Sequence, residues 1–404
     1  MSMCCGVEIS FQLLFLSSSP CVRSEWMSAR KIAVNFLKYG LALGLLAMVV
    51  YRQWDPPGAR GLSHLWHERI LAGQLNWFAL VGAWCCLAGA TAITIFRWGL
   101  LIRALEIPLP WPEVWKLGWV GILFNNLLPG SVGGDLVKAT LAAKPFPGKR
   151  TFAVASVVFD RVMALWGLFA MSGATWAILS VTGTMEEANS PALDRVARMV
   201  AISAVGMLVV WWGLGLFSAT AAERMVQRAT QRWQPWGVLA ELIRGIVWFR
   251  HRPWAVAQAM AVTTCGQILF VLSFYLVAFA LEGDLTQGAN ERFPGLAWHY
   301  LLVPLGMVLM AVPLFPGGLG IGEWGYGALY SLVIGEAGRP AGVAASLGQR
   351  VLNWLVALLG LRAWGLVKWD TDHPGADKSG PMVEDGKAMA GVRPESGKEF
   401  GNAH

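Results

Sequence analysis

Long apolar stretches separated by short polar segments run through most of the chain. Six of these stretches are long enough to cross a bilayer, which takes about 18–20 residues in a helix. They cover residues 32–51, 76–96, 154–181, 197–217, 254–281 and 343–367. Backbone groups in lipid must be hydrogen-bonded within the protein, so spans of this length are expected to be helical. The pattern predicts an all-α, polytopic integral membrane protein.

Two further apolar stretches, residues 117–128 and 300–315, are too short to be ordinary spans. Each runs into a break rich in proline and glycine and is followed by another short apolar piece, at 136–143 and 324–334. A short helix that stops and returns forms a hairpin, which enters and leaves the membrane on one side. We therefore expect about six full spans and two re-entrant helical hairpins.

The distribution of basic residues supports this arrangement, because cytoplasmic segments carry an excess of Lys and Arg. The segments 97–116 and 144–150 are both basic, which places both ends of the first hairpin in the cytoplasm, and the acidic loops 184–196 and 282–297 are expected outside. The second hairpin would then enter from the outside, and both termini would be cytoplasmic. Arg52, Arg60 and Arg69 fall on the predicted outer side and depart mildly from the rule.

Composition and charge narrow the class of protein further. Only 14% of the residues are charged and 55% are hydrophobic, which leaves too little polar surface for a soluble domain. The net charge of +7 comes largely from basic residues between the spans, where anionic headgroups are a simpler partner than nucleic acid. Neither the six cysteines nor the six histidines form a metal-binding motif, and no catalytic triad is visible. We expect no metal, cofactor or nucleic acid.

The two ends of the chain are expected to lie outside the membrane domain. Residues 1–26 make a poor signal peptide, and Met27 opens a basic stretch that leads directly into the first span. We interpret 1–26 as a dubious N-terminal extension, with translation starting at Met27. Residues 370–404 have little apolar content and are predicted to be a disordered cytoplasmic tail.

The two breaks resemble each other and define an internal repeat. "LLPGSVGGD" (127–135) and "LFPGGLGIGE" (314–323) each place an acid at a helix start, and "SVVFDRV" and "AASLGQRV" each place an arginine within the next span. Since the two hairpins enter from opposite sides, this is an inverted repeat, which in transporters points to a binding site near the midplane.

Broken helices leave free backbone amides, and a phosphate group is a natural partner for a helix start. Glycines allow a headgroup to approach the backbone closely, and Lys138 would share a helix face with Asp135. The candidate substrate-binding residues are Asn125, Asn126, Gly130, Gly133, Gly134, Asp135, Lys138, Asp160, Arg161, Gly318, Gly320, Glu323 and Arg350.

Structural interpretations of the same residues remain open. Asp135 and Glu323 could simply cap their helices. Arg161 and Arg350 lie several residues into spans, where charges are costly and are usually functional, yet a structural ion pair accounts for them as well as a ligand contact does. Arg161 is expected to pair across helices with Asp135 or Glu323.

At "FNNLLPGSVGGDLVKA", "SVVFDRV" and "PGGLGIGE" the sequence resembles the lysylphosphatidylglycerol synthase transmembrane-region family, over about residues 30–368. The family pattern usually has arginine at the position of Lys138. The resemblance implies that residues 27–369 form a flippase-like transmembrane domain of the bacterial inner membrane. In fused members this module moves an aminoacylated phospholipid between leaflets. Their aminoacyl-transferase domain does not follow the last span here, so we do not expect this chain to synthesise that lipid.

The favoured hypothesis is a translocator of a phospholipid or polyprenyl-linked lipid, more a transporter than an enzyme, with no catalytic residues. One alternative is a membrane enzyme that acts on lipid-linked substrates through Asp135 and Glu323. Another is an accessory or scaffold subunit that binds a lipid-synthesis enzyme through the basic segment 218–253. A homo-oligomer is also open.

Overall fold

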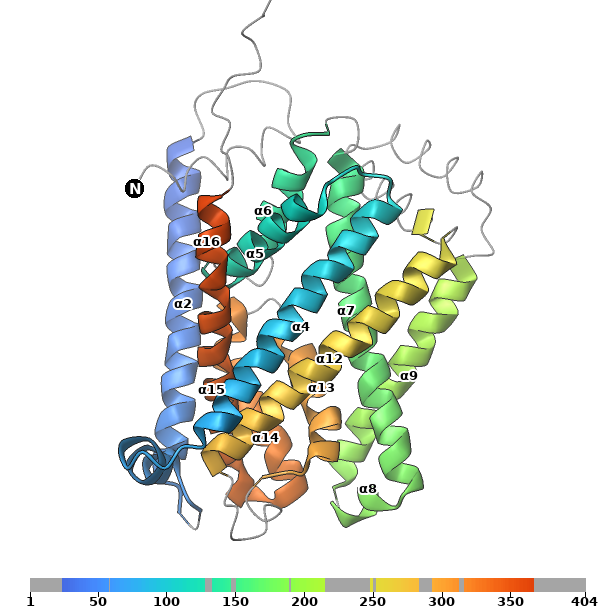
Figure 1. The fold of residues 1–404 in the computed structure, drawn as a ribbon. Coiled ribbons are helices and arrows are strands. Elements are labelled where there is room, and N and C mark those ends of the chain that lie inside the picture. Colours follow the sequence, from blue (N-terminus) through green and yellow to red (C-terminus); the bar gives the residue numbers. More distant parts are fainter. Residues whose placement is uncertain are drawn as a thin grey trace, which may run out of the picture. The chain divides into compact units, whose positions relative to one another are not determined.

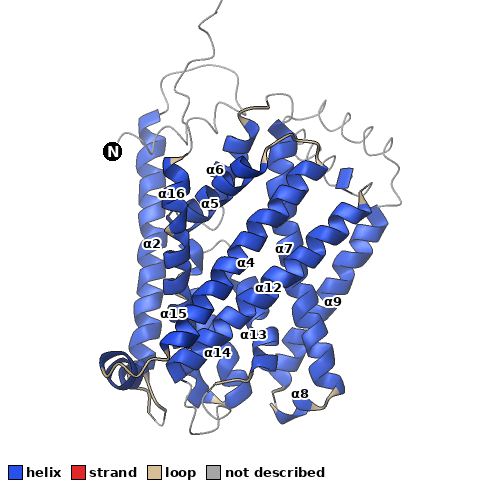
Figure 2. Ribbon diagram, viewed as in Figure 1, coloured by secondary structure: helices blue, strands red, loops and turns tan. Residues whose placement is uncertain are grey.

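The computed structural model describes residues 24–57, 59–127, 133–146, 150–188, 190–214, 248–249, 252–282, 293–311 and 316–366. All regular structure in these ranges is helical (Figure 2), which confirms the all-α prediction. The described residues all belong to one compact unit, and a second unit, 368–404, lies outside the described ranges. Three parts of the sequence-based predictions also lie outside these ranges: Gly130, the tail 370–404 and most of the extension 1–26.

Five helical stretches are long and apolar enough to cross a membrane, which confirms a polytopic membrane protein. Four of them lie in α4 (Trp77–Ala104), α7 (Arg150–Val181), α9 (Pro191–Leu214) and α12 (Pro253–Glu282). The fifth, Glu336–Gly365, combines η5 (Glu336–Gly338), α15 (Arg339–Ala357) and α16 (Leu359–Gly365). The predicted first span, 32–51, lies within α2 (Ser24–Trp54), which is not among the five.

The predicted hairpins correspond to two pairs of shorter helices. The first pair is α5 (Trp111–Leu127) with α6 (Gly133–Ala143), and the second is α13 (Leu296–Ala311) with α14 (Ile321–Ile334). At a rise of about 1.5 Å per residue, even α5 extends about 26 Å, less than the ~30 Å hydrocarbon core. The helices of each pair pack against each other. Figure 1 shows α5 and α6 near one end of the bundle and α13 and α14 near the other. Their re-entry into a bilayer stays a prediction.

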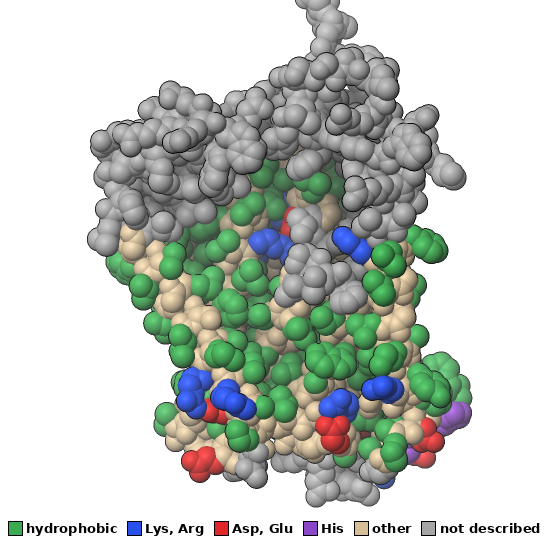
Figure 3. Space-filling view, turned by 180° about the vertical axis from the view of Figure 1, so that it is seen from behind, with side chains coloured by type: hydrophobic (Ala, Val, Ile, Leu, Met, Phe, Trp, Pro, Cys, Tyr) green, Lys and Arg blue, Asp and Glu red, His purple; other side chains and the backbone are tan. Residues whose placement is uncertain are grey.

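Two long helices, α4 and α12, pack along each other (Figure 1). Helix α4 also contacts α5 of the first hairpin, and α12 contacts α13 of the second. Their contact is close at Gly266, where an added Cβ would lie 3.1 Å from Ile93 Cγ2. The remaining described elements are short: α3 (Leu62–His64), the π-helix η1 (Leu65–Leu71), α8 (Thr184–Glu187) and the 3-10 turn η4 (Pro316–Gly318). Apolar side chains cover a broad belt on the face seen in Figure 3, with charged side chains along its lower edge.

One boundary prediction was wrong, and the error bears on function. The span predicted to end at residue 96 continues as α4 to Ala104, so Arg97 lies within the helix and not beyond its end. Its side chain is buried, with only 5% of the residue exposed. A buried charge is tolerated where it is paired and hydrogen-bonded, and tertiary contacts supply both here.

Candidate functional site

Five charged side chains from α4, α6 and α7 lie together inside the helix bundle. We call them the first-repeat charge cluster: Arg97, Asp135, Lys138, Asp160 and Arg161. Four of the five are at most 7% exposed, and Arg161 is the exception, with 48% of its side chain accessible. Figure 3 shows basic and acidic side chains next to each other in the upper part of the described surface. Charges at this depth in a membrane protein are rare and usually functional.

Arg97 connects three helices. Its Nε donates to Oδ1 of Asp160 on α7 at 2.8 Å, and one terminal nitrogen donates to Oγ1 of Thr263 on α12 at 3.2 Å. The Thr263 hydroxyl in turn donates to the Ala259 carbonyl at 2.6 Å. Asp160 is therefore held by a guanidinium that is itself fixed from a second helix.

Lys138 lies between the two carboxylates. Its Nζ is 3.9 Å from Oδ1 of Asp135 and 3.8 Å from Oδ2 of Asp160. The same nitrogen sits 4.6 Å from the ring centroid of Trp98, a cation–π contact. Trp98 is completely buried and is oriented by donating from Nε1 to Oγ of Ser156 at 3.2 Å. The lysine is thus oriented by an aromatic face as well as by two acids.

Arg161 pairs with Asp135 through its Nε, as one of the two sequence-based alternatives predicted. Asp160 and Arg161 are neighbours in the chain and point to different partners, but both belong to the cluster. With all five groups ionised, three cations face two carboxylates, so the cluster has a formal surplus of one positive charge. Its most exposed cation is Arg161. The arrangement can accept an anion at that side chain.

A side chain of α5 contacts the start of α6. Asn125 Oδ1 accepts a hydrogen bond from the Gly134 backbone nitrogen at 2.9 Å. The helices are so close that a Cβ on Gly134 would lie 1.9 Å from the Gly121 carbonyl oxygen. Asn126 instead donates to the Ile122 carbonyl within its own helix. Asn125 therefore has a capping contact, and Gly133, the first residue of α6, is half-buried beside it.

The second repeat holds a different arrangement. Glu323 is completely buried and accepts from Arg350 Nε at 2.6 Å and from the Gly320 backbone nitrogen at 2.7 Å. Arg350 also donates to the carbonyls of Gly317 at 3.0 Å and Gly318 at 3.3 Å. Gly317, Gly318 and Gly320 all have positive φ, which glycine adopts without strain. These contacts hold the turn ahead of α14 in place.

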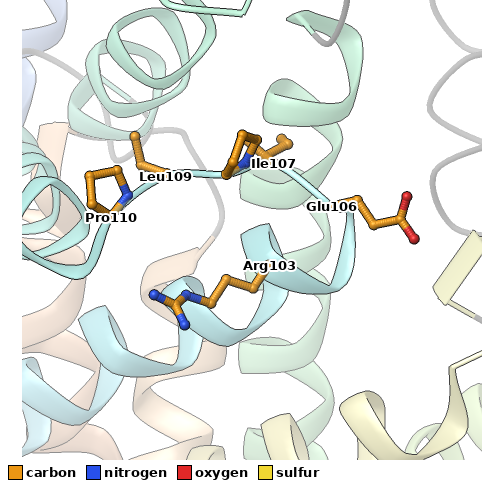
Figure 4. Close-up of a pocket in the computed structure, with 6 residues that line it drawn as sticks. Arg103, Glu106, Ile107, Leu109 and Pro110 are labelled. Carbon is orange, nitrogen blue, oxygen red and sulfur yellow. The ribbon is translucent and has the colours of Figure 1, made fainter.

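A surface depression lies apart from the predicted site residues. It is lined by Arg103 in the last turn of α4 and by residues 106–110 between α4 and α5. Figure 4 shows Arg103 and Glu106 extending away from each other at its rim, and Glu106 is paired with Arg252. None of the candidate residues named from the sequence lines this depression.

A family model described as "Lysylphosphatidylglycerol synthase TM region" matches residues 36–360, which is most of the chain. The protein belongs to this family, whose members contain a membrane module linked to lipid modification or flipping. A search of curated proteins and a search of solved structures each gave no match.

Sequence reasoning missed one member of the cluster, Arg97, and two residues that contact it, Trp98 and Thr263. For Arg97 a signal was available, because "RWGLLIRA" continues apolar helical sequence beyond the charge. A single arginine ended the predicted span too early. Trp98 is one of 22 tryptophans, and nothing near it or near Thr263 in the sequence marks either residue as a partner of a charge.

Proposed function

We propose that this protein binds the anionic headgroup of a phospholipid or polyprenyl-linked lipid and carries it between the leaflets of the bacterial inner membrane. The observation that carries the proposal is the first-repeat charge cluster, with its surplus positive charge and its half-exposed Arg161. A phosphodiester has one negative charge and accepts charge-assisted hydrogen bonds from guanidinium and ammonium groups. The acyl chains would remain in the lipid beside the cluster.

The proposed role of the cluster is to lower the free-energy cost of placing a charged headgroup inside the membrane. Attraction between charges is much stronger in a low dielectric than in water, so a surplus cation offsets a large part of the desolvation cost of the phosphate. Asp135 and Asp160 keep the three cations together when no lipid is bound. The sequence has no nucleotide-binding motif, so a driving force would come from an ion gradient, or movement would be passive.

The test is lipid movement in proteoliposomes that contain phosphatidylcholine and a trace of fluorescent phosphatidylglycerol or polyprenyl-phosphate sugar. An impermeant quencher reports the fraction of labelled lipid that reaches the outer leaflet. We expect wild-type protein to move at least one anionic lipid, and Asp135→Asn with Arg161→Ala to abolish the movement. The matched control is Arg198→Ala, which removes an exposed arginine paired with Asp194 on α9.

Equal movement of all lipids by wild type and the double variant would contradict the proposal. Absence of movement in both, with correctly folded protein, would do the same and would favour the accessory alternative. The segment proposed to bind a synthesis enzyme, 218–253, lies mostly outside the described residues.

A further inference from the structure

The depression at the end of α4 contains an exposed arginine that is not part of the charge cluster. Arg103 lies in the last turn of α4, at the rim of the depression (Figure 4). In the described part of the chain no carboxylate pairs with it, and its guanidinium carbon lies instead 4.3 Å from the ring centroid of Trp111. An exposed guanidinium without an acidic neighbour is able to bind an anion through charge-assisted hydrogen bonds.

An aromatic surface leads from Arg103 toward the middle of α4. Phe96, Gly99 and Arg103 follow each other at spacings of three and four residues, so they share one face of the helix. The Trp111 ring packs on this face, because an added Cβ on Gly99 would lie only 2.4 Å from its Cζ3. The same ring is stacked on Phe96, with centroids 5.2 Å apart and planes 9° apart, and Phe96 is 38% exposed. The face therefore has a cation at one end and accessible aromatic surface at the other.

The turn that lines the depression is held in a strained conformation. Glu106 has a φ of +57°, and it is the one residue other than glycine with positive φ in the described ranges. Such a conformation persists only where the surroundings fix it. Here Glu106 pairs with Arg252, and its neighbours Ile107 and Leu109 are buried. The shape of the depression is thus set before any ligand binds.

The same pairing decides the charge at the rim. Because Glu106 is paired with Arg252 and extends away from Arg103 (Figure 4), the one acid that lines the depression does not neutralise Arg103. With all three groups ionised, two arginines face one carboxylate, which leaves a formal surplus of one positive charge. The volume of the depression, about 520 Å³, is within the range of small-molecule sites.

The position of Arg103 favours a lipid over a soluble anion. Helix α4 is long and apolar enough to cross a membrane, so an arginine in its last turn lies at the level of the headgroups. A soluble anion would contact the guanidinium alone. A phospholipid would in addition place its apolar part against Phe96 and Trp111, as aromatic side chains at membrane interfaces allow.

We propose that this depression is a second lipid site, in which Arg103 binds the phosphate of an anionic phospholipid whose acyl chains lie along Phe96 and Trp111. It is separate from the charge cluster: Arg103 lies six residues beyond the buried Arg97, about 9 Å farther along α4 and on another face. The site does not depend on lipid movement by the cluster. In the predicted orientation its lipid belongs to the cytoplasmic leaflet.

The test is photocrosslinking of the full-length protein in phosphatidylcholine vesicles that contain a trace of phosphatidylglycerol with a diazirine in its headgroup. Mass spectrometry of the digested protein reports labelling of residues 96–111 and, separately, of α6 and α7. Arg103→Gln is expected to lower labelling of 96–111 at least about fivefold, which is the contribution of one basic residue near an anionic headgroup. Labelling of α6 and α7, and the melting temperature, should stay unchanged, since the side chain is exposed.

The matched control is Arg362→Gln. Arg362 is also exposed in the last turn of its helix, α16, and has no carboxylate partner in the described ranges, but it does not line the depression. This variant should label residues 96–111 as wild type does.

Two results would overturn the proposal. Equal labelling of 96–111 in wild type and Arg103→Gln, or by the matching phosphatidylcholine probe, would mean ordinary contact with bulk lipid. Competition by glycerol phosphate as effective as that by unlabelled phosphatidylglycerol would assign the depression to a soluble anion. Labelling of α6 and α7 reports on the charge cluster, so a failure of the proposed function is distinguishable from a failure of this site.

Discussion

Nε of Arg97 lies 2.8 Å from Oδ1 of Asp160, and this ion pair joins α4 to α7 within the buried part of the helix bundle. The two residues are 63 positions apart in the chain, and neither side chain is more than 7% exposed. Lys138 approaches the second carboxylate oxygen of Asp160 from α6. One carboxylate on α7 thus holds cations from two other helices, α4 and α6, in the charge cluster.

Removing only Arg97 should lower the folding stability more than removing both charges of the Arg97–Asp160 pair. Arg97→Met leaves the Asp160 charge buried with Lys138 as its nearest cation, and we expect a loss of about 3–5 kcal/mol, as for other broken buried pairs. Arg97→Met combined with Asp160→Asn should cost clearly less. Unfolding by denaturant or heat in detergent is measured for these two variants and for Asp160→Asn, and the three losses together give the coupling energy. Equal losses for Arg97→Met and the double variant would show that the stranded Asp160 carboxylate carries no cost.

Gly134 should not tolerate a methyl group. An alanine Cβ there would lie 1.9 Å from the Gly121 carbonyl oxygen and 2.5 Å from the Asn125 backbone nitrogen, so α5 and α6 would have to separate. We expect Gly134→Ala to destabilise the protein by about 1–3 kcal/mol or more. Gly206→Ala in α9 is the matched control, since no atom lies within 4 Å of its added Cβ. Melting temperatures of the two variants check the prediction, and similar values would overturn it.

The second hairpin should depend on a buried histidine–tyrosine contact that the sequence did not single out. His299 Nδ1 is 3.0 Å from the Gly295 carbonyl, which can only accept, so we assign the ring proton to Nδ1. Nε2 then accepts from the Tyr330 hydroxyl at 2.6 Å. Tyr330→Phe should cost about 1–3 kcal/mol, because a buried acceptor loses its donor.

Thermal unfolding of Tyr330→Phe, compared with Tyr51→Phe, tests this contact. The Tyr51 control is suitable because the residue is 83% exposed. His299→Phe combined with Tyr330→Phe removes both polar partners and is expected to be less damaging than the two single losses added together. Strict additivity would mean that the two side chains do not stabilise each other.

The re-entrant hairpins can be tested by labelling single cysteines in a background with all six native cysteines replaced. Glu106→Cys precedes α5 and Lys144→Cys follows α6, so these two positions flank the first hairpin. Thr182→Cys follows the last residue of α7, and Glu336→Cys follows the end of α14. An impermeant maleimide should label the first two from the cytoplasmic side and the last two from the outside. Labelling of Glu106→Cys and Lys144→Cys from opposite sides would mean that the first hairpin crosses the membrane.

The apolar pattern by itself was sufficient for the all-α fold and for the positions of the two pairs of short helices, α5 with α6 and α13 with α14. Spans of about 20 apolar residues leave few alternatives to a helix in lipid, and Pro-Gly breaks in short stretches interrupt the helical hydrogen bonds wherever they occur. The repeat of "PGSVGGD" and "PGGLGIGE" was also visible, as were the acids and arginines that form the Asp135–Arg161 and Glu323–Arg350 pairs. These are local signals, carried by composition and spacing.

The tertiary structure decided which of those charges belong together and how the two repeats differ. Arg97 joined the cluster because helix packing brings α4 against α7 and α12, so that Asp160 and Thr263 stabilise a charge that a linear hydropathy pattern treats as the end of a span. The exposure of Arg161 and the enclosure of Arg350 follow in the same way from what surrounds each side chain. Sequence spacing sets which residues share a helix face, but the energy of a buried charge depends on partners from distant segments, which only the packed helices define.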